Sequence, residues 1–267
     1  MTSTILLTGG TGTLGRLVAP LLRDAGCTVR VLSRRPHGPG SVVGDLSTGE
    51  GIDAAVAGAA TILHCAGSTK GDGDKARHLV RAATRAGGAP HLVYISVVGA
   101  DRVPVVSAVD RAGFGYFAEK LAGEEAIAGS GLPWTTLRAT QFHELILTVV
   151  RQLAKLPLIP VPAGVRFQPV DAGEVAARLA ELTLGRPAGL VDDFGGPAVH
   201  GMNDLVRSYL RATGRRRPIV PVRFAGGAYR AIRDGAHLSP GPATGRRTWE
   251  GFLAEHAAAQ ASHPRTV

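Results

Sequence analysis

A glycine turn that joins an apolar strand to a helix constrains this chain more than any other feature. The segment runs from Ile5 to Gly15 and has the spacing G-x-G-x-x-G at Gly10, Gly12 and Gly15. In this pattern the glycines permit a tight turn, close approach of the backbone to a pyrophosphate, and close packing of helix on strand. The anion then lies against backbone N–H groups at the positive end of the helix dipole.

The flanking segments distinguish this turn from a chance spacing among the 36 glycines of the chain. Residues 3–8 are β-branched and apolar, as in a buried strand. After the turn, apolar residues recur at helical spacing, at Leu14, Leu17, Val18, Leu21 and Leu22. These flanks favour a nucleotide-phosphate site over the alternative, a glycine-rich strand-to-helix turn that binds no ligand.

Two arginines follow the next predicted strand, residues 27–32. A dinucleotide fold places an Asp or Glu near this point, on the ribose 2′-hydroxyl of NAD, but here the strand ends in Ser33, Arg34 and Arg35. A guanidinium offers a planar fork of donors suited to a phosphate dianion. The sequence therefore predicts NADP(H) as the cofactor, and the alternative is that the two arginines form a solvated loop pair.

Length and composition indicate a globular protein with a substantial core. The chain has 267 residues, 45% of them hydrophobic, which suits one α/β domain with a small appendage. We expect no signal peptide and no membrane segment, since the most apolar later window, residues 145–161, is interrupted by charges and prolines. Cys27 and Cys65 lie in predicted buried strands without metal-ligand spacing, so we expect reduced core cysteines, no metal site and a cytoplasmic protein.

The formal net charge of +9 raises the question of nucleic-acid binding. Arginine supplies most of the charge in short clusters, at 34–35, 215–217 and 246–247, which are scattered between apolar elements. The clusters lack interleaved aromatic residues and match no groove-reading motif. We therefore expect a small-molecule substrate and no nucleic acid as partner, and the sequence leaves monomer and homodimer open.

Strand and helix patterns alternate with short connections through the first half of the chain. After the first two strands we predict strands at 41–46, 60–67 and 91–96, with helices at 51–58 and 74–87. Such alternation is typical of a parallel sheet with right-handed crossovers. The predicted fold class is α/β, a Rossmann-type doubly wound parallel sheet with a small C-terminal substrate lobe.

We expect one domain over residues 1–267, with a cofactor-binding part at about 1–140 and a substrate lobe assembled mainly from 141–260. The lobe is predicted to contain strands at 190–194 and 219–222 and helices at 203–212 and 249–258, and residues from Ala261 onward are expected to fray. The carboxyl ends of the sheet strands meet at one crevice. Residues at these ends are expected around one ligand: Gly9, Arg34, Asp45, Ala66 and Ser96.

Tyr116 and Lys120 are four residues apart at the head of a predicted helix that runs to about Ala128, so they share one helix face. A nearby ammonium favours phenolate over phenol and lowers the pKa of a tyrosine, which makes it a better proton donor or acceptor near neutral pH. Ser96, at the preceding strand end, is placed to orient a substrate carbonyl. The alternative is a solvated stripe on the helix surface.

Together these segments resemble the short-chain dehydrogenase/reductase superfamily. The resemblance is carried by residues 8–15, the basic segment 33–35, Asp45-Leu46, Ser96 and Tyr116-x-x-x-Lys120. The segments 131–142 and 167–171 are similar to those of the atypical or extended branch, which includes NmrA-like and isoflavone-reductase-like NAD(P)H-binding proteins.

The resemblance implies a role for each matching residue. Gly9, Gly12 and Gly15 would hold the pyrophosphate, Arg34 and Arg35 the 2′-phosphate, and Asp45 the adenine. Lys120 would hold the nicotinamide ribose, and Tyr116 would be the acid/base. The predicted cofactor-binding residues are Gly9, Gly10, Thr11, Gly12, Thr13, Leu14, Gly15, Ser33, Arg34, Arg35, Asp45, Leu46, Ala66, Gly67 and Lys120.

The predicted function is NADPH-dependent reduction of a carbonyl, quinone or conjugated double bond of a small molecule, with Tyr116, Lys120 and Ser96 as catalytic residues. The substrate pocket is expected to include Gln141, Phe142 and His143, although a surface histidine at a helix N-terminus explains His143 equally well. His64 is expected to be a packed strand residue with a backbone partner. The alternatives are an NADP(H)-sensing regulator of the NmrA-like type without catalysis, and an epimerase or dehydratase that uses the cofactor transiently.

Overall fold

The central sheet of the computed structural model, which describes residues 3–36, 38–68 and 70–261, is entirely parallel. Its strands are β1 (Thr4–Thr8), β2 (Thr28–Ser33), β3 (Ser41–Val43), β4 (Thr61–His64), β5 (His91–Val97), β6 (Trp134–Ala139) and β9 (Gly189–Leu190). They are ordered β3-β2-β1-β4-β5-β6-β9, so the chain runs outward from β1 to one edge and then returns past β1 to the other. This order confirms the predicted doubly wound α/β class.

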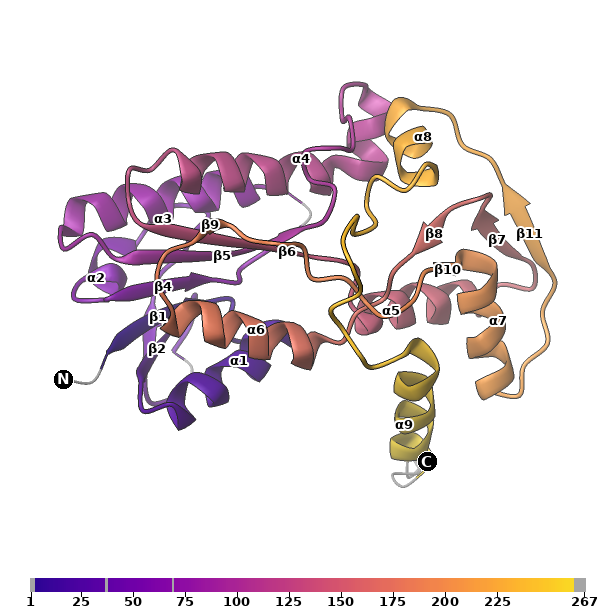
Figure 1. The fold of residues 1–267 in the computed structure, drawn as a ribbon, viewed down its shortest axis with the longest axis horizontal. Helices are drawn as coiled ribbons and strands as arrows, with labels where there is room; N and C mark the ends of the chain where they lie inside the picture. Colours follow the sequence, from indigo (N-terminus) through magenta and orange to yellow (C-terminus); the bar gives the residue numbers. More distant parts are fainter. Residues whose placement is uncertain (1–2, 37, 69, 262–267) are drawn as a thin grey trace.

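Helices cover both faces of the sheet (Figure 1). One layer contains α2 (Ile52–Val56), α3 (Asp72–Ala86) and α4 (Ala108–Ala128), and the other contains α1 (Thr13–Asp24) and α6 (Ala172–Leu184). Successive residues of β1 point to opposite layers, so Leu6 belongs to the core on one side and Leu7 to the core on the other. The near-continuous apolar strands predicted from the sequence are therefore buried on both faces.

The remaining elements form a lobe beyond the carboxyl ends of the strands, on the right in Figure 1. They are α5 (His143–Leu153), β7 (Ile159–Pro162), β8 (Arg166–Phe167), β10 (His200–Gly201), α7 (Met202–Ala212), β11 (Ile219–Val222), α8 (Gly227–Arg233) and α9 (Trp249–Ala261). β11 pairs with β7 and β10 with β8 in two small sheets. The lobe has its own core, in which the buried Trp249 donates from Nε1 to Ser208 Oγ at 2.9 Å.

Helix α4 begins two turns earlier than the sequence interpretation placed it. Ser107 and Asp110 form a capping box: Ser107 Oγ accepts from the Asp110 backbone N at 3.0 Å, and the Ser107 backbone N donates to Asp110 Oδ2 at 3.2 Å. The S-x-x-D pattern was present in the sequence and marks this start. Asp110 Oδ1 also accepts from the backbone N of Ala228 at 3.1 Å, which fastens α8 to α4. Tyr116 is thus inside a long helix and not at its head.

The predicted strand at 190–194 was assigned to the wrong part of the molecule. Only its first residue, Leu190, belongs to β9, which lies at the edge of the main sheet beside β6. Phe194 also donates from its backbone N to Arg138 O at 2.8 Å. A strand pattern shows that backbone groups need partners but not which neighbour supplies them. Helix α9 continues to Ala261, where fraying was expected, and the rest of that predicted tail is outside the described residues.

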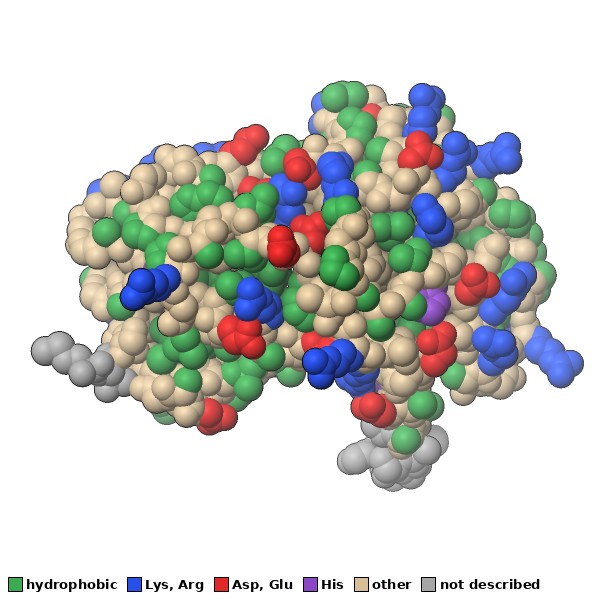
Figure 2. Space-filling model, viewed as in Figure 1, with side chains coloured by type: hydrophobic (Ala, Val, Ile, Leu, Met, Phe, Trp, Pro, Cys, Tyr) green, Lys and Arg blue, Asp and Glu red, His purple; other side chains and the backbone are tan. Residues whose placement is uncertain are grey.

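Basic side chains are most numerous over the lobe on the face shown in Figure 2, where acidic side chains are interspersed among them. The segment after α7, residues 213–218, is exposed and includes Arg215, Arg216 and Arg217. Throughout the described ranges, every helix is too short or too polar to cross a membrane.

Candidate cofactor-binding and active site

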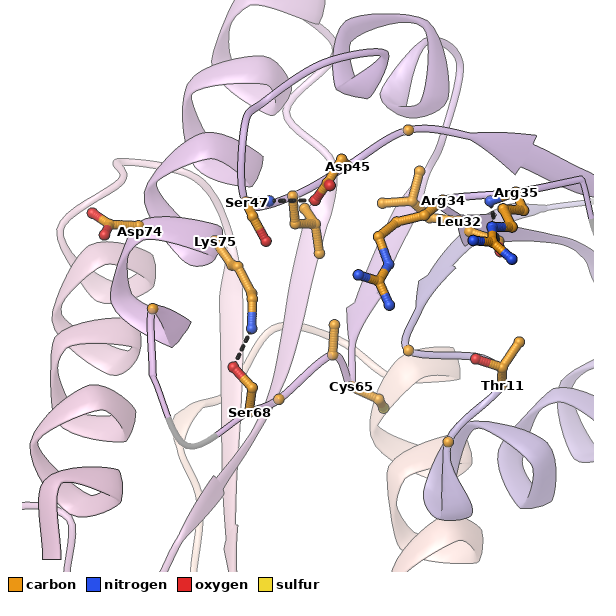
Figure 3. A pocket seen from close by; sticks show the side chains of 18 of the residues that line it. Thr11, Leu32, Arg34, Arg35, Asp45, Ser47, Cys65, Ser68, Asp74 and Lys75 are labelled. Atoms are coloured by element: carbon orange, nitrogen blue, oxygen red, sulfur yellow. Dashed lines mark hydrogen bonds between the residues drawn. The ribbon is translucent and has the colours of Figure 1, made fainter. Parts of the chain in front are cut away.

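A cavity of about 1300 Å³ lies over the carboxyl ends of β1, β2 and β4 (Figure 3). Its lining comes from four segments at the ends of β1, β2, β3 and β4, the last of which continues into α3. The lining residues are Gly9, Thr11, Gly12, Leu32, Ser33, Arg34, Arg35, Pro36, Gly44, Asp45, Leu46, Ser47, Cys65, Ala66, Gly67, Ser68, Lys70, Gly71, Asp74 and Lys75. Since parallel strands end at the same edge, the topology brings these separate segments around one space.

The glycine turn has the backbone conformation and close approach that its spacing predicts. Gly9 has φ +68°, and a Cβ there would lie 2.6 Å from the backbone N of Ala66, so the turn presses directly on the segment after β4. Gly12 is the N-cap of α1, and among the described residues no side chain caps this helix. Because Gly12 lines the cavity, the uncapped start of α1 and the positive end of its dipole lie at the cavity.

Several predicted cofactor residues support this turn without lining the cavity. Leu14 is buried in the core, and a Cβ at Gly10 would lie 2.5 Å from Val31 Cγ1. A Cβ at Gly15 would lie only 2.2 Å from Gly9 O and 2.5 Å from Gly10 Cα. Gly15 therefore sets the packing of α1 against the turn.

Gly15→Ala is expected to lower stability by about 1–3 kcal/mol, because the new methyl group overlaps backbone atoms that cannot rotate away. The turn would have to shift, so affinity for NADPH is expected to fall as well. Gly113→Ala is a matched control in α4, where a Cβ meets nothing within 4 Å, and it is expected to stabilise by roughly 0.5–1 kcal/mol. Thermal unfolding and cofactor titration of both variants test this; equal behaviour would contradict it.

Arg34 and Arg35 follow β2 and are both exposed at the cavity. Figure 3 shows the Arg34 side chain extending into the cavity, with Arg35 nearer to Thr11. Within the described part of the chain, neither guanidinium makes a hydrogen bond or an ion pair. Two unpaired cations at this position are arranged to accept an anion rather than to stabilise the fold.

Asp45 lies across the cavity from the glycine turn. Its Oδ1 accepts from the Ser47 backbone N at 2.8 Å, and its backbone pairs with Glu50, so the carboxylate is held in one place. Leu46 beside it is nearly buried and gives this wall an apolar surface. Ser47, Lys70 and Lys75 also line the cavity and were not predicted, because they carry no motif and are brought in by the loop paths.

The segment after β4 forms the opposite wall of the cavity and contains Cys65. Both cysteines were expected inside buried strands, and both lie outside them. Cys65 follows the last residue of β4 and lines the cavity, and Cys27 precedes β2, so each is only partly buried. Burial nevertheless raises the pKa of Cys65 to about 12, so its thiol stays protonated. Ala66 and Gly67 line the cavity as predicted.

Lys120 is not directed into the open cavity but lies behind its wall. It is 3% exposed, its Nζ is 3.3 Å from Asp72 Oδ2, and it donates to Ile95 O at 3.3 Å. A Cβ at Gly67 would lie 3.1 Å from the same Nζ, so only a glycine separates this ammonium from the cavity. The close packing explains why the position after Ala66 has no side chain.

Tyr116 and Ser96 lie near Lys120, but the pKa of Tyr116 shifts in the direction opposite to the one expected. The Tyr116 ring centroid is 5.7 Å from Lys120 Nζ, and the buried Ser96 follows Ile95, whose carbonyl Lys120 binds. The ammonium was expected to lower the pKa of Tyr116. Instead, desolvation, and then the negative charge of Asp72, raise the pKa of Tyr116 above its ordinary value, although 37% of the residue is exposed and solvent weakens both effects.

His64 has a side-chain partner in place of the expected backbone partner. Its Nδ1 is 2.7 Å from Thr8 Oγ1, and Thr8 Oγ1 also accepts from the Ala66 backbone N at 3.2 Å. Burial lowers the pKa of His64 to about 3, so the ring is neutral. It stacks on Tyr94 at a centroid distance of 5.3 Å and supports the segment that forms the cavity wall.

The three residues predicted for the substrate pocket do not line the cavity. Gln141 links lobe segments, donating from Nε2 to His237 O and accepting at Oε1 from the Gln168 backbone N, each at 3.2 Å. Phe142 precedes α5 and pairs with Val170. His143 is fully buried against α9, with its ring centroid 4.9 Å from that of Phe252, so neither the pocket nor the surface interpretation was right. The 3.6-residue pattern of α5 does not reveal that α9 covers it.

Residues 9–154 match a family described as NAD(P)H-binding. The chain is 30% identical to the (4-alkanoyl-5-oxo-2,5-dihydrofuran-3-yl)methyl phosphate reductase of Streptomyces griseus, over 82% of this chain and 76% of that protein.

Two solved structures share the fold along nearly their whole length. One is an NADPH-dependent quinone oxidoreductase from Escherichia coli complexed with NADPH, at 18% identity and TM-score 0.77, covering 94% of this chain and 99% of that one. The other is a short-chain dehydrogenase/reductase superfamily protein from Agrobacterium tumefaciens with bound NAD, at 20% identity and TM-score 0.72, covering 97% of each chain. The predicted resemblance is thereby confirmed. The family match spans more than half of the sequence and includes all the segments that line the cavity. This chain therefore belongs to the NAD(P)H-binding oxidoreductase family with the short-chain dehydrogenase/reductase fold.

Proposed function

We propose that this protein is an NADPH-dependent reductase of a small molecule that carries a carbonyl, quinone or conjugated double bond. The observation that carries the proposal is the pair of unpaired guanidinium groups, Arg34 and Arg35, at the cavity position where this fold selects between NAD and NADP. The 2′-phosphate would bind there, the pyrophosphate at Gly9 and Gly12, and the adenine beside Asp45.

The geometry of this cavity fits the cofactor. At Gly9 the turn packs so closely on the neighbouring backbone that a Cβ would collide with it. The start of α1 has no side-chain cap among the described residues, so its backbone N–H groups can donate to an anion. When bound, NADPH supplies a hydride from its dihydronicotinamide. Tyr116 would supply the proton and Ser96 would orient the substrate oxygen, and Lys120, whose Nζ lies behind Gly67 in the cavity wall, would hold the ribose.

The reductase relative narrows the substrate class. Its name describes a 5-oxo-dihydrofuran with an alkanoyl group, in which the ring double bond is conjugated with carbonyl groups. By analogy, we favour a conjugated double bond of an unsaturated lactone or ketone as the group that this chain reduces. Addition of hydride to one carbon of such a bond leaves an enolate, and Tyr116 would protonate it.

The test is NADPH oxidation against a panel of unsaturated lactones, enones, quinones and ketones, followed by absorbance. We expect turnover with at least one conjugated substrate and a product that has gained two hydrogens, identified by mass spectrometry. A protein that binds NADPH but oxidises it with no member of the panel would favour the sensing regulator. That alternative is supported by one observation, the pairing of Lys120 with Asp72 instead of with Tyr116.

A further inference from the structure

The end of the lobe farthest from the main sheet is built from β7 and β11 (Figure 1). The two strands pair in parallel, with Ile159 opposite Ile219, and the backbone N of Ile159 donates to Pro218 O at 2.9 Å. Parallel pairing places the residues that precede the two strands on the same side. The loop that leaves α5, residues 154–158, therefore lies beside the loop that leaves α7, residues 213–218. We call residues 155–160 and 211–223 the distal surface.

The distal surface is strongly basic and contains no Asp or Glu. Its basic residues are Lys155, Arg211, Arg215, Arg216, Arg217 and Arg223, all of which are exposed. Lys155 donates to Gln152 Oε1 at 2.8 Å and Arg217 to the carbonyl of Arg216 at 2.9 Å. Over the described ranges, none of the six cations pairs with a carboxylate. Their charge is therefore not neutralised within the chain and is available to an anionic partner.

Apolar side chains stand among these cations. Leu156 is 41% exposed, Leu158 is 49% exposed and Val220 is 38% exposed. Both leucines are in the loop directly after Lys155, and Val220 lies on β11 opposite Pro160 of β7. Exposed apolar side chains interspersed with cations suit a partner that has an anionic surface over an apolar interior.

Prolines restrict what kind of partner can bind here. Pro157 and Pro218 are in the two loops, and Pro160 and Pro221 are in the paired strands. Because proline has no backbone N–H, a strand of another protein could not form a continuous ladder along either strand. For the same reason, few backbone donors lose water when this end of the lobe enters a less polar medium. The prolines therefore favour a lipid surface over the addition of a strand.

We propose that the distal surface is a docking site for an anionic phospholipid bilayer. The arginines bind lipid phosphates, and Leu156 and Leu158 enter the boundary between head groups and acyl chains. Nucleic acid fits less well, since exposed leucines contribute nothing to phosphate binding and neither loop has an aromatic ring for base stacking. Such binding lies in the plane of the interface and needs no spanning helix. The inference is independent of the proposed function.

The test is co-sedimentation of the full chain with vesicles of phosphatidylglycerol and phosphatidylcholine in equal parts, and with vesicles of phosphatidylcholine alone, at about 0.15 M salt. We expect binding to the anionic vesicles, little binding to the neutral ones, and weaker binding as salt is added. The triple variant Arg215→Gln, Arg216→Gln, Arg217→Gln is expected to lower the partition coefficient by roughly tenfold to a hundredfold. The double variant Leu156→Ser, Leu158→Ser is expected to lower it by about tenfold.

Two control variants have matched changes outside the distal surface. Arg23→Gln, Arg81→Gln, Arg186→Gln removes the same charge from exposed sites on the other half of the molecule. Leu184→Ser, Leu190→Ser removes two leucines that are each 51% exposed. Both controls are expected to bind the anionic vesicles like the wild type, and thermal unfolding checks that all the variants fold.

Three results would overturn the proposal. The first is a wild type that does not sediment with the anionic vesicles, including one that instead binds duplex DNA at the same salt concentration. The second is an equal loss of binding in the two arginine triple variants, which would show dependence on total charge alone. The third is undiminished binding in Leu156→Ser, Leu158→Ser, which would show that the leucines do not enter the bilayer.

Discussion

Tyr116→Phe is expected to lower the turnover of NADPH-dependent reduction by about 10²- to 10⁴-fold, the usual contribution of a positioned general acid. The substitution removes the hydroxyl that we propose as proton donor but keeps the ring, which packs edge-to-face on Phe117 at a centroid distance of 6.1 Å. Cofactor affinity is therefore expected to stay close to that of the wild type. Steady-state kinetics with the best substrate of the panel, together with NADPH titration by fluorescence, measure both quantities.

Tyr209→Phe is the matched control, because it removes a phenol hydroxyl from α7 in the lobe core, away from the cavity. Its turnover is expected to equal that of the wild type. Undiminished turnover in Tyr116→Phe would remove this residue from the mechanism. A loss of NADPH affinity equal to the loss of turnover would instead indicate that Tyr116 acts in binding.

Arg34→Ala is expected to reduce the preference for NADPH over NADH by roughly tenfold to a hundredfold. A charge-assisted hydrogen bond contributes about 1.5–3 kcal/mol, and about 1.4 kcal/mol corresponds to a factor of ten in affinity. Affinity for NADH, which has no 2′-phosphate, should change little. Titration of both cofactors into wild type, Arg34→Ala and Arg35→Ala separates the contributions of the two guanidinium groups.

Arg178→Ala is a suitable control, since Arg178 is partly exposed on α6 and pairs only with Glu181 among the described residues. The NADPH preference should also weaken as salt is added, because the arginines at the cavity are exposed and screened. Equal affinity of the wild type for NADPH and NADH would refute the assignment of Arg34 and Arg35 to the 2′-phosphate.

The sequence by itself determined the architecture of the cofactor half. The glycine spacing, the apolar strands and the short connections allow few folds other than a doubly wound parallel sheet, because backbone geometry and handedness limit how such units connect. Local patterns also predicted β11 at the boundaries found, since apolar β-branched residues form most of it. The cavity position of Arg34 and Asp45 followed from topology alone.

The tertiary structure alone decided which groups surround Tyr116 and Lys120. The spacing of Tyr116 and Lys120 placed both on one face of α4, but the nearest charge to Lys120 is Asp72, which is 48 positions earlier in the chain and carries no motif. Likewise, α9 buries His143, and β9 joins the main sheet. Periodicity in the sequence shows which side of a helix or strand is apolar. Packing between distant segments decides which element covers that side and which charged residue pairs with a buried ammonium.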